Sequence, residues 1–192
     1  MDRAPDDRLH FTGDPEADRL LVAEPLALLI GFALDQQVPV QKAFSGPLEL
    51  KRRLGHLDAT RIASMPAEDL DRAFRERPAL HRFPGAMASR VRELCAVIAD
   101  TYAGDASRVW TDAADGPDLR RRLLALPAFG PMKADGVTAI LAHRLGLSLP
   151  NLEAVMPDHP TLGDVDSPES LVEYQTRKRA AKAELRARSE EP

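Results

Sequence analysis

The chain has 192 residues, of which 44% are hydrophobic and 5% aromatic, and its formal net charge is −4. This length and composition fit one globular domain with a core of its own, and they favour helices over sheet. The acidic balance excludes a surface that is basic throughout, although nucleic-acid binding needs only one basic face. A single cysteine, Cys95, excludes a four-cysteine iron–sulfur cluster. The five histidines lack metal-ligand spacing, so we expect no metal and no cofactor.

The polar start of the chain and its longest apolar run predict where the protein resides and how it is divided. Residues 1–12 are charged and polar, unlike a signal peptide, and the apolar run at 25–34 is too short to cross a bilayer. We therefore expect a cytoplasmic protein that does not associate with membranes. The expected division is a disordered N-terminus at 1–12, a helical domain at 13–146, and a last part at 147–192. That last part combines an irregular segment with a charged helix packed on the domain.

Apolar periodicity, caps and helix breakers predict an all-α fold without a strand. Asp14, Asp58 and Ser167 stand where N-caps are expected. The run at 25–34 is apolar nearly all round, which predicts a central buried helix. A loop at 77–85, a connector at 105–116 and an irregular stretch at 146–168 separate the helices. The expected helices span residues 14–22, 25–34, 42–54, 58–64, 66–74, 86–103, 117–126, 131–145 and 168–188.

The most informative stretch reads Leu126-Pro127-Ala128-Phe129-Gly130-Pro131-Met132-Lys133-Ala134. An apolar helix ends here, a Pro/Gly turn follows, and a second helix begins with Pro131 near its first position. So short a turn leaves the amides around Gly130, Met132 and Lys133 pointing outward at the positive end of the helix dipole, which can bind one phosphate. The alternative is an ordinary pair of antiparallel helices joined by a tight turn.

Two upstream segments agree with this hairpin in order and spacing. Residues 28–37 form an apolar helix that ends on Asp35-Gln36-Gln37, and residues 83–94 form a glycine turn that opens a long helix. A Gly-Asp pair follows that helix at 104–105. Together the three segments resemble the helix-hairpin-helix GPD (HhH-GPD) superfamily of base-excision DNA glycosylases, in particular a small actinobacterial subgroup. The resemblance covers about residues 14–146.

The resemblance implies a two-lobed helical glycosylase fold and a protein that flips a damaged base out of double-stranded DNA. Enzymes of this kind hold a phosphate, fill the gap in the base stack and cleave the C1′–N bond of the extruded nucleotide. It implies a monomer that needs no cofactor. The residues expected to contact DNA are Gln36, which would enter the vacated stack, Gln37, Ala128, Phe129, Gly130, Met132 and Lys133. A solvated helix end is the alternative for the two glutamines.

The chain departs from the superfamily at both residues that carry its chemistry. Met132 stands where bifunctional relatives have a nucleophilic Lys. Lys133 lies about 100° further round the helix, so its side chain should face elsewhere, towards a phosphate. We therefore expect no Lys-dependent strand-cleaving (AP lyase) step. Phe32 stands where adenine-mismatch enzymes place a Glu, which argues against that chemistry.

The signature aspartate of the superfamily is also displaced. The position that should hold it falls on residues 150–151, which are not acidic. The nearest candidates for a catalytic carboxylate are Glu153, Asp158 and Asp166, each of which is otherwise a loop or cap residue. In the loop before residue 84, Phe83 is a candidate for stacking on a base, against the alternative of a buried loop aromatic.

Two functions remain open from these residues. The first is a monofunctional DNA N-glycosylase in base-excision repair, assisted by a carboxylate from the 150–166 region. The second is a non-catalytic helix-hairpin-helix protein that recognises distorted DNA and has lost both signature residues.

Overall fold

The computed structural model describes residues 6–189, together with the side chains of all of these except 181, 182 and 184–189. This range forms ten α-helices and two short 3-10 helices, with no strand, so the predicted all-α class is confirmed. The elements are α1 (Pro15–Ala23), α2 (Pro25–Leu34), α3 (Val40–Leu54), α4 (Ala59–Ser64), α5 (Ala67–Arg75), α6 (Pro84–Tyr102), α7 (Arg108–Thr111), α8 (Gly116–Leu124), α9 (Pro131–His143), η1 (Leu152–Val155), η2 (Leu162–Asp164) and α10 (Pro168–Ser189).

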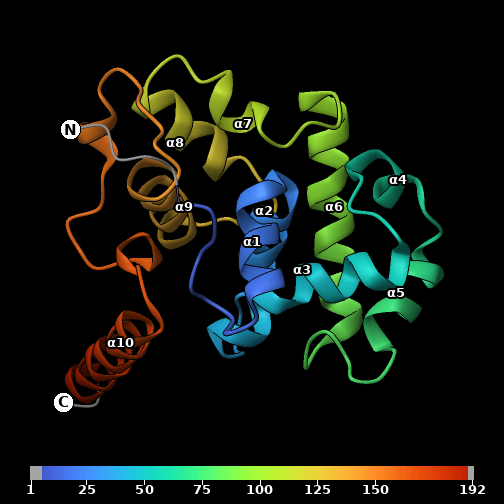
Figure 1. Cartoon of the computed structure of the whole chain (residues 1–192), viewed down its shortest axis with the longest axis horizontal. Coiled ribbons are helices and arrows are strands. Elements are labelled where there is room, and N and C mark those ends of the chain that lie inside the picture. The colour runs from blue at the N-terminus through green and yellow to red at the C-terminus, as the bar shows by residue number, and fades with distance from the viewer. Residues whose placement is uncertain (1–5, 190–192) are drawn as a thin grey trace.

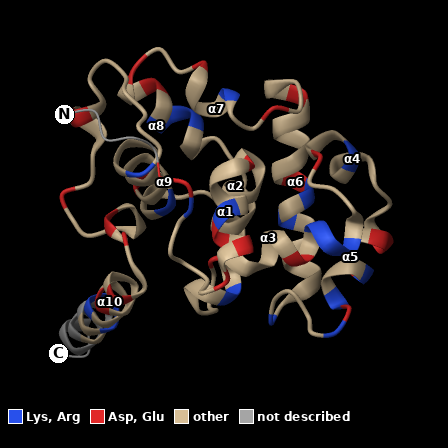
Figure 2. Ribbon diagram, viewed as in Figure 1, with Lys and Arg blue, Asp and Glu red and all other residues tan. Residues whose placement is uncertain are grey.

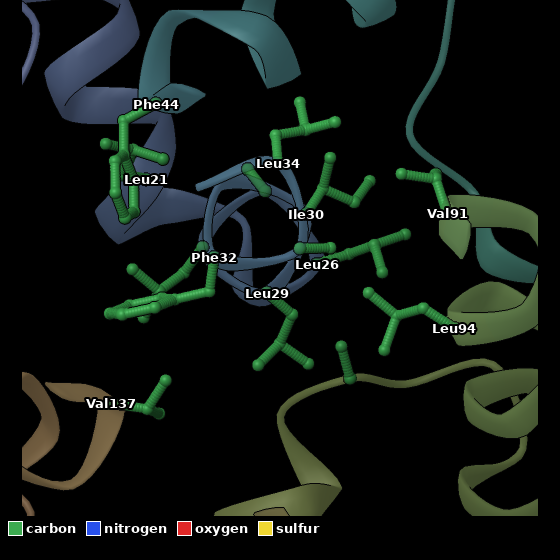
Figure 3. Packing of buried hydrophobic residues seen from close by; sticks show 14 of the residues in the cluster. Leu21, Leu26, Leu29, Ile30, Phe32, Leu34, Phe44, Val91, Leu94 and Val137 are labelled. Atoms are coloured by element: carbon green, nitrogen blue, oxygen red, sulfur yellow. The ribbon is translucent and has the colours of Figure 1, made fainter. Parts of the chain in front are cut away.

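The centre of the core is α2, as its uniformly apolar sequence predicts. Every residue of this helix after Pro25 is buried. Figure 3 shows its side chains pointing outward in several directions, with Leu21 and Phe44 on one side, Val91 and Leu94 on another, and Val137 of α9 on a third. A helix that is apolar all round must be surrounded by other elements, and α2 therefore fixes the positions of its neighbours.

Three predicted N-caps are confirmed, whereas the cap expected at Ser64 or Met65 for the helix beginning near 66 is not, since α5 begins after Pro66 without a side-chain cap. The Asp14 carboxylate accepts a hydrogen bond from the Glu16 amide at 2.8 Å, and that of Asp58 accepts one from the Arg61 amide at 2.8 Å. At the start of α10, the Ser167 hydroxyl accepts from the Ser170 amide at 3.2 Å. Each cap satisfies an amide that the first turn of a helix leaves unpaired.

Helix α7 was not expected, since it lies inside the predicted connector at 105–116. It is only four residues long, which is too short for an apolar periodicity to appear in the sequence. Its Val109 and Trp110 are buried, so packing holds this turn of helix in place.

The beginning of the chain is more ordered than expected. Residues 1–5 of the predicted disordered segment lie outside the described residues, but Leu9 and Phe11 are buried in the core. The Phe11 ring meets the Phe44 ring edge-on at 5.1 Å. The buried Asp18 carboxylate accepts from the amides of Phe11 at 3.1 Å and Thr12 at 3.0 Å. The buried side chains of Leu9 and Phe11, together with the Asp18 carboxylate, therefore hold this polar segment against α1 and α3.

The elements pack in two groups that meet at α2. Helices α1 to α6 contact one another, while α7, α8, α9, η1 and η2 form a second set of contacts (Figure 1). Between the groups, the Phe32 ring lies edge-on to Phe44 at 5.1 Å and tilted to Phe129 at 6.3 Å. A Cβ added to Gly136 of α9 would lie 3.0 Å from the Phe32 ring. The absence of a side chain at Gly136 therefore allows α9 to approach α2 closely.

Helix α10 is anchored by its first turns. Leu171 is buried, and the Gln175 side-chain amide donates to Gln41 of α3 at 2.9 Å. Side chains 176–180 are exposed, and the helix extends away from the other helices in Figure 1. Residues 190–192 of the predicted C-terminal part lie outside the described residues.

Candidate nucleic-acid interface

The hairpin forms as the sequence predicts, with α8 ending at Leu124 and α9 beginning at Pro131. In the turn, Ala128 adopts a left-handed conformation with φ 67°. The amide of Phe129 donates to the Leu126 carbonyl at 3.2 Å, and its ring is buried. Ala128 and Phe129, both predicted to contact DNA, thus shape the turn, and Phe129 packs inward as its anchor.

The tip of the hairpin is open to solvent. Gly130 is the N-cap of α9, and a Cβ added there would meet nothing within 4 Å. Met132 is 64% exposed. The amides of Gly130 and Met132 make no hydrogen bond to any described residue, whereas that of Lys133 donates to the Gly130 carbonyl at 3.1 Å. Two amides, and not the predicted three, are therefore unpaired at the positive end of the α9 dipole.

The loop after α2 at residues 35–37, called the glutamine loop below, contains two predicted DNA contacts with different surroundings. The Gln36 side-chain oxygen accepts a hydrogen bond from the Arg90 guanidinium of α6, and its carbonyl contacts the His81 ring at 2.9 Å. Gln37 is exposed and adopts a left-handed conformation with φ 56°. In this structure Gln37, and not Gln36, has a side chain that protrudes without a partner in the described part of the chain.

The loop before α6 lies against the glutamine loop. Because His81 Nδ1 accepts from the Phe83 amide at 3.0 Å, its proton is on Nε2, which donates to the Gln36 carbonyl. Burial lowers the pKa of His81 and keeps the ring neutral. A buried loop aromatic was the alternative to base stacking for Phe83. The structure leaves this side chain 44% exposed, with the Arg82 guanidinium 4.8 Å from its ring centre. This aromatic surface can stack on a base.

Lys133 faces the interior, and the expectation that it points towards an external phosphate is wrong. Its Nζ is buried and has no hydrogen-bond partner among the described residues. Burial lowers the pKa of Lys133 to about 8, the Asp35 charge raises it, and the Arg90 charge lowers it further. The amine also lies 6.0 Å from the Phe129 ring centre. A rotation of 100° along α9 thus turns this side chain towards α2 rather than away from the protein.

Asp35, the C-cap of α2, faces Lys133 from the other group of helices. Burial raises the pKa of this carboxyl, while the charges of Lys178 and Lys133 lower it. Tyr174 of α10 belongs to the same cluster, because burial raises the pKa of its hydroxyl and Asp35 interacts with it electrostatically. Charged groups at the end of α2 and on α6, α9 and α10 therefore influence one another beside the hairpin.

The three predicted catalytic carboxylates lie elsewhere. Asp158 is fully exposed, with His159 Nδ1 at 3.4 Å, and Glu153 is exposed in η1. Asp166 is exposed, and a hydrogen bond with the Ser170 hydroxyl lowers its pKa. Within the described residues, no hydrogen bond or ion pair joins any of the three to residues 128–133 of the hairpin.

Sequence reasoning gave no role to Asp35 or Arg90, although both lie within the segments that carried the resemblance. A carboxylate directly after a uniformly apolar helix was the one available signal for Asp35. Acidic and basic residues are interspersed over most elements in Figure 2, so charge alone does not single out this region.

Comparisons with protein-family models, with curated proteins and with solved structures found no match for this chain. No helix of the described part is long and apolar enough to cross a membrane. The same part contains no group of three or more His, Cys, Asp or Glu side chains that could hold a metal ion.

Proposed function

We propose that this protein binds double-stranded DNA and acts as a monofunctional DNA N-glycosylase in base-excision repair, with the two-lobed fold of the HhH-GPD superfamily. The observation that carries the proposal is the exposed hairpin tip, where two unpaired amides and an open glycine stand at the start of α9. A DNA phosphate fits this site, because it accepts both amide protons and its charge is favoured by the helix dipole.

The neighbouring loops supply what recognition of an extruded base requires. His81 and Arg90 join the glutamine loop to the loop before α6. His81 also accepts a hydrogen bond from the Phe83 amide, so the loop that carries the exposed Gln37 lies against the loop that carries Phe83 and Arg82. An amide can fill the gap in a base stack and pair with the orphaned base, while an aromatic ring and a guanidinium can stack on unpaired bases.

A hydrolytic reaction without a lysine nucleophile agrees best with the position of Lys133. Its amine exposes no surface, so it would have to leave its buried position before it could attack C1′. Met132, at the position where bifunctional relatives have their lysine, has no nucleophilic atom. We therefore propose base release without strand cleavage.

The alternative is a DNA-binding protein without catalysis, which the exposed positions of Glu153, Asp158 and Asp166 favour. Against it stand two ionisable groups beside the hairpin, the half-buried carboxylate of Asp35 and the buried amine of Lys133. Groups with perturbed pKa values that gather near a binding surface are more typical of a reaction centre than of a scaffold.

The decisive experiment is an assay for abasic-site formation on a panel of duplexes. Each duplex carries one altered base: uracil, hypoxanthine, ethenoadenine, an alkylated purine or an oxidised guanine. We expect one of them to yield abasic sites that alkali converts to breaks, with no break in the absence of alkali. Tight binding without base release on every duplex would instead support the non-catalytic protein.

A further inference from the structure

Where α2 meets α9, two ionisable groups have no role that the sequence predicts, the half-buried carboxylate of Asp35 and the buried amine of Lys133. Asp35 ends α2, and Lys133 lies in the first turn of α9, so each group comes from a different set of packed helices. They are close enough for each charge to shift the pKa of the other. The pair therefore exists only where the two groups of helices meet, beside the exposed hairpin tip.

Both groups have unused hydrogen-bonding capacity. Lys133 Nζ has three donors and is buried with no hydrogen-bond partner among the described residues. The Asp35 carboxylate is half-buried, and no hydrogen bond joins it to another residue in the described part of the chain. Buried polar groups normally have their bonds satisfied, and each exception requires an explanation. A binding site whose ligand supplies the missing partners is one such explanation.

The surroundings favour a partly ionised Asp35. The charged and titratable groups that face it are Lys133 of α9, and Tyr174 and Lys178 of α10. Arg90 of α6 acts on Lys133 and holds the adjacent Gln36. Burial raises the pKa of Asp35, and the two ammonium groups oppose that rise. A carboxylate whose pKa is raised by burial is a better proton acceptor than an exposed one.

We propose that Asp35, at the end of α2, is the catalytic carboxylate of base release and that Lys133, whose buried amine has no other partner in the described part of the chain, is its positioning residue. This inference rests on the proposed glycosylase function. In the reaction, a water oxygen forms a bond to C1′ while the C1′–N bond breaks. The electron pair of that bond leaves with the base, which takes a proton from solvent. The proton lost by the water passes to Asp35, whose negative charge also offsets the positive charge that develops at C1′.

This assignment replaces the three carboxylates that sequence spacing indicated. Asp158 is fully exposed, and Glu153 and Asp166 are exposed as well. An exposed carboxylate acts in a high dielectric, where its effect on a developing charge is weak. Asp35 is half-buried and adjoins Gln36 and Gln37, both of which the sequence predicts to contact DNA.

The test uses the full chain and the duplex from the panel that yields abasic sites. Asp35→Asn removes the proton acceptor without changing the shape of the side chain, and base release should fall by about 100-fold or more. Duplex affinity and the helix content seen by circular dichroism should stay close to those of the parent, because the amide has the shape of the carboxylate and adds no charge at the DNA interface. The matched control is Asp158→Asn, which should release base at the parental rate.

Lys133→Met tests the positioning role through the pH profile. Without the neighbouring ammonium group, the pKa of Asp35 rises, so base release should fall at low pH and recover as pH is raised. An unchanged profile would remove Lys133 from the mechanism. A borohydride-trapped adduct with abasic DNA that disappears in Lys133→Met would identify the amine as a nucleophile and overturn the positioning role.

The assays distinguish failure of the glycosylase function from failure of the role of Asp35. If the parent releases no base from any duplex, the glycosylase function and the role of Asp35 both fail. If the parent is active and Asp35→Asn is equally active, only the role of Asp35 is overturned.

Discussion

Gly130 allows the proposed binding of DNA to be tested separately from folding. We expect Gly130→Asp to weaken duplex binding by about 1–3 kcal/mol, because its carboxylate would repel a phosphate and occupy the amides that bind it. The same aspartate should not unfold the protein. Gly130 is an N-cap with φ −106°, where Asp is among the preferred residues and its side chain meets open space. Titration of a labelled duplex at fixed salt measures the change in affinity.

The control for this variant is Gly130→Ala. Alanine adds a methyl group to open space and no charge, so duplex affinity should change far less than with aspartate. Equal affinities for the parent and Gly130→Asp would remove the hairpin tip from the DNA interface.

Lys133 should make stability depend on pH in the alkaline range. The unfolded chain protonates this amine below its ordinary pKa of 10.5, but the folded chain does so only below about 8. Between these values the unfolded state binds more protons, so the free energy of unfolding rises with pH from about 8 to 10.5. Below pH 8 the folded protein bears the whole cost of a buried ammonium group.

Lys133→Met removes that cost. At pH 7 we expect the variant to be more stable than the parent by about 1–3 kcal/mol, a range that allows for solvent screening at a half-buried site. The difference should shrink as pH rises from about 8 through 10.5, because the folded amine is already neutral there and the unfolded amine loses its proton progressively. Urea unfolding at pH 7 and pH 10 measures both values, and a variant less stable than the parent at pH 7 would contradict the buried position of Nζ.

At the scale of elements, η2 packs on α9 through a glycine. A Cβ added to Gly163 would lie 2.5 Å from the backbone of Ala139, which cannot move aside as a flexible side chain can. The Gly163 carbonyl also accepts a hydrogen bond from Arg144 Nε at 2.9 Å. Gly163→Ala should therefore force η2 away from α9 and lower the free energy of unfolding by about 1–3 kcal/mol.

Urea unfolding measures this loss as well. Gly130→Ala is again the matched control, because the same methyl group meets nothing there, and it should cost less than about 1 kcal/mol. If both variants were equally stable, η2 would not be in close contact with α9 in solution.

Local rules predicted most of the elements. Asp14, Asp58 and Ser167 each cap the helix they were expected to begin, because a cap depends on only two or three consecutive residues. The four-residue α7 escaped prediction because its stability comes from buried contacts of Val109 and Trp110 rather than from a local pattern. Leu9 and Phe11 escaped it for the same reason.

At the scale of the whole molecule, Phe32 couples the two groups of helices. Its ring contacts Phe44 of α3 and Phe129 of the hairpin, and it is almost fully buried. We expect Phe32→Ala to lower the free energy of unfolding by about 3–5 kcal/mol. Because the loss lies between the groups, unfolding should also become less cooperative, with two transitions in place of one.

Two probes can detect that change. The only tryptophan, Trp110, lies in α7 and reports on the second group, whereas circular dichroism reports on all helices. In Phe32→Ala the two midpoints should separate. Phe74→Ala is the control, since it removes a buried ring from α5 inside the first group and should leave the midpoints together. Coincident midpoints in Phe32→Ala would show that α2 is not the coupling element.

The sequence by itself determined the helical class, the central position of α2 and the Pro/Gly hairpin that opens α9. Each of these depends on neighbouring residues, whose periodicity, caps and turn chemistry act over one or two turns of chain. The resemblance to base-excision glycosylases came from the same local segments, and the activity it implies is still a prediction.

Only the tertiary structure decided how the residues of the candidate site are oriented. Lys133 lies far from Asp35 in the sequence, and its inward direction follows from how α9 packs on α2 through Gly136 and Phe32. Arg90 holds Gln36 and leaves Gln37 exposed, which depends equally on the position of α6. Burial and the distance between charges are properties of packed elements, so the perturbed pKa values of Asp35 and Lys133 arise only when the two groups of helices meet.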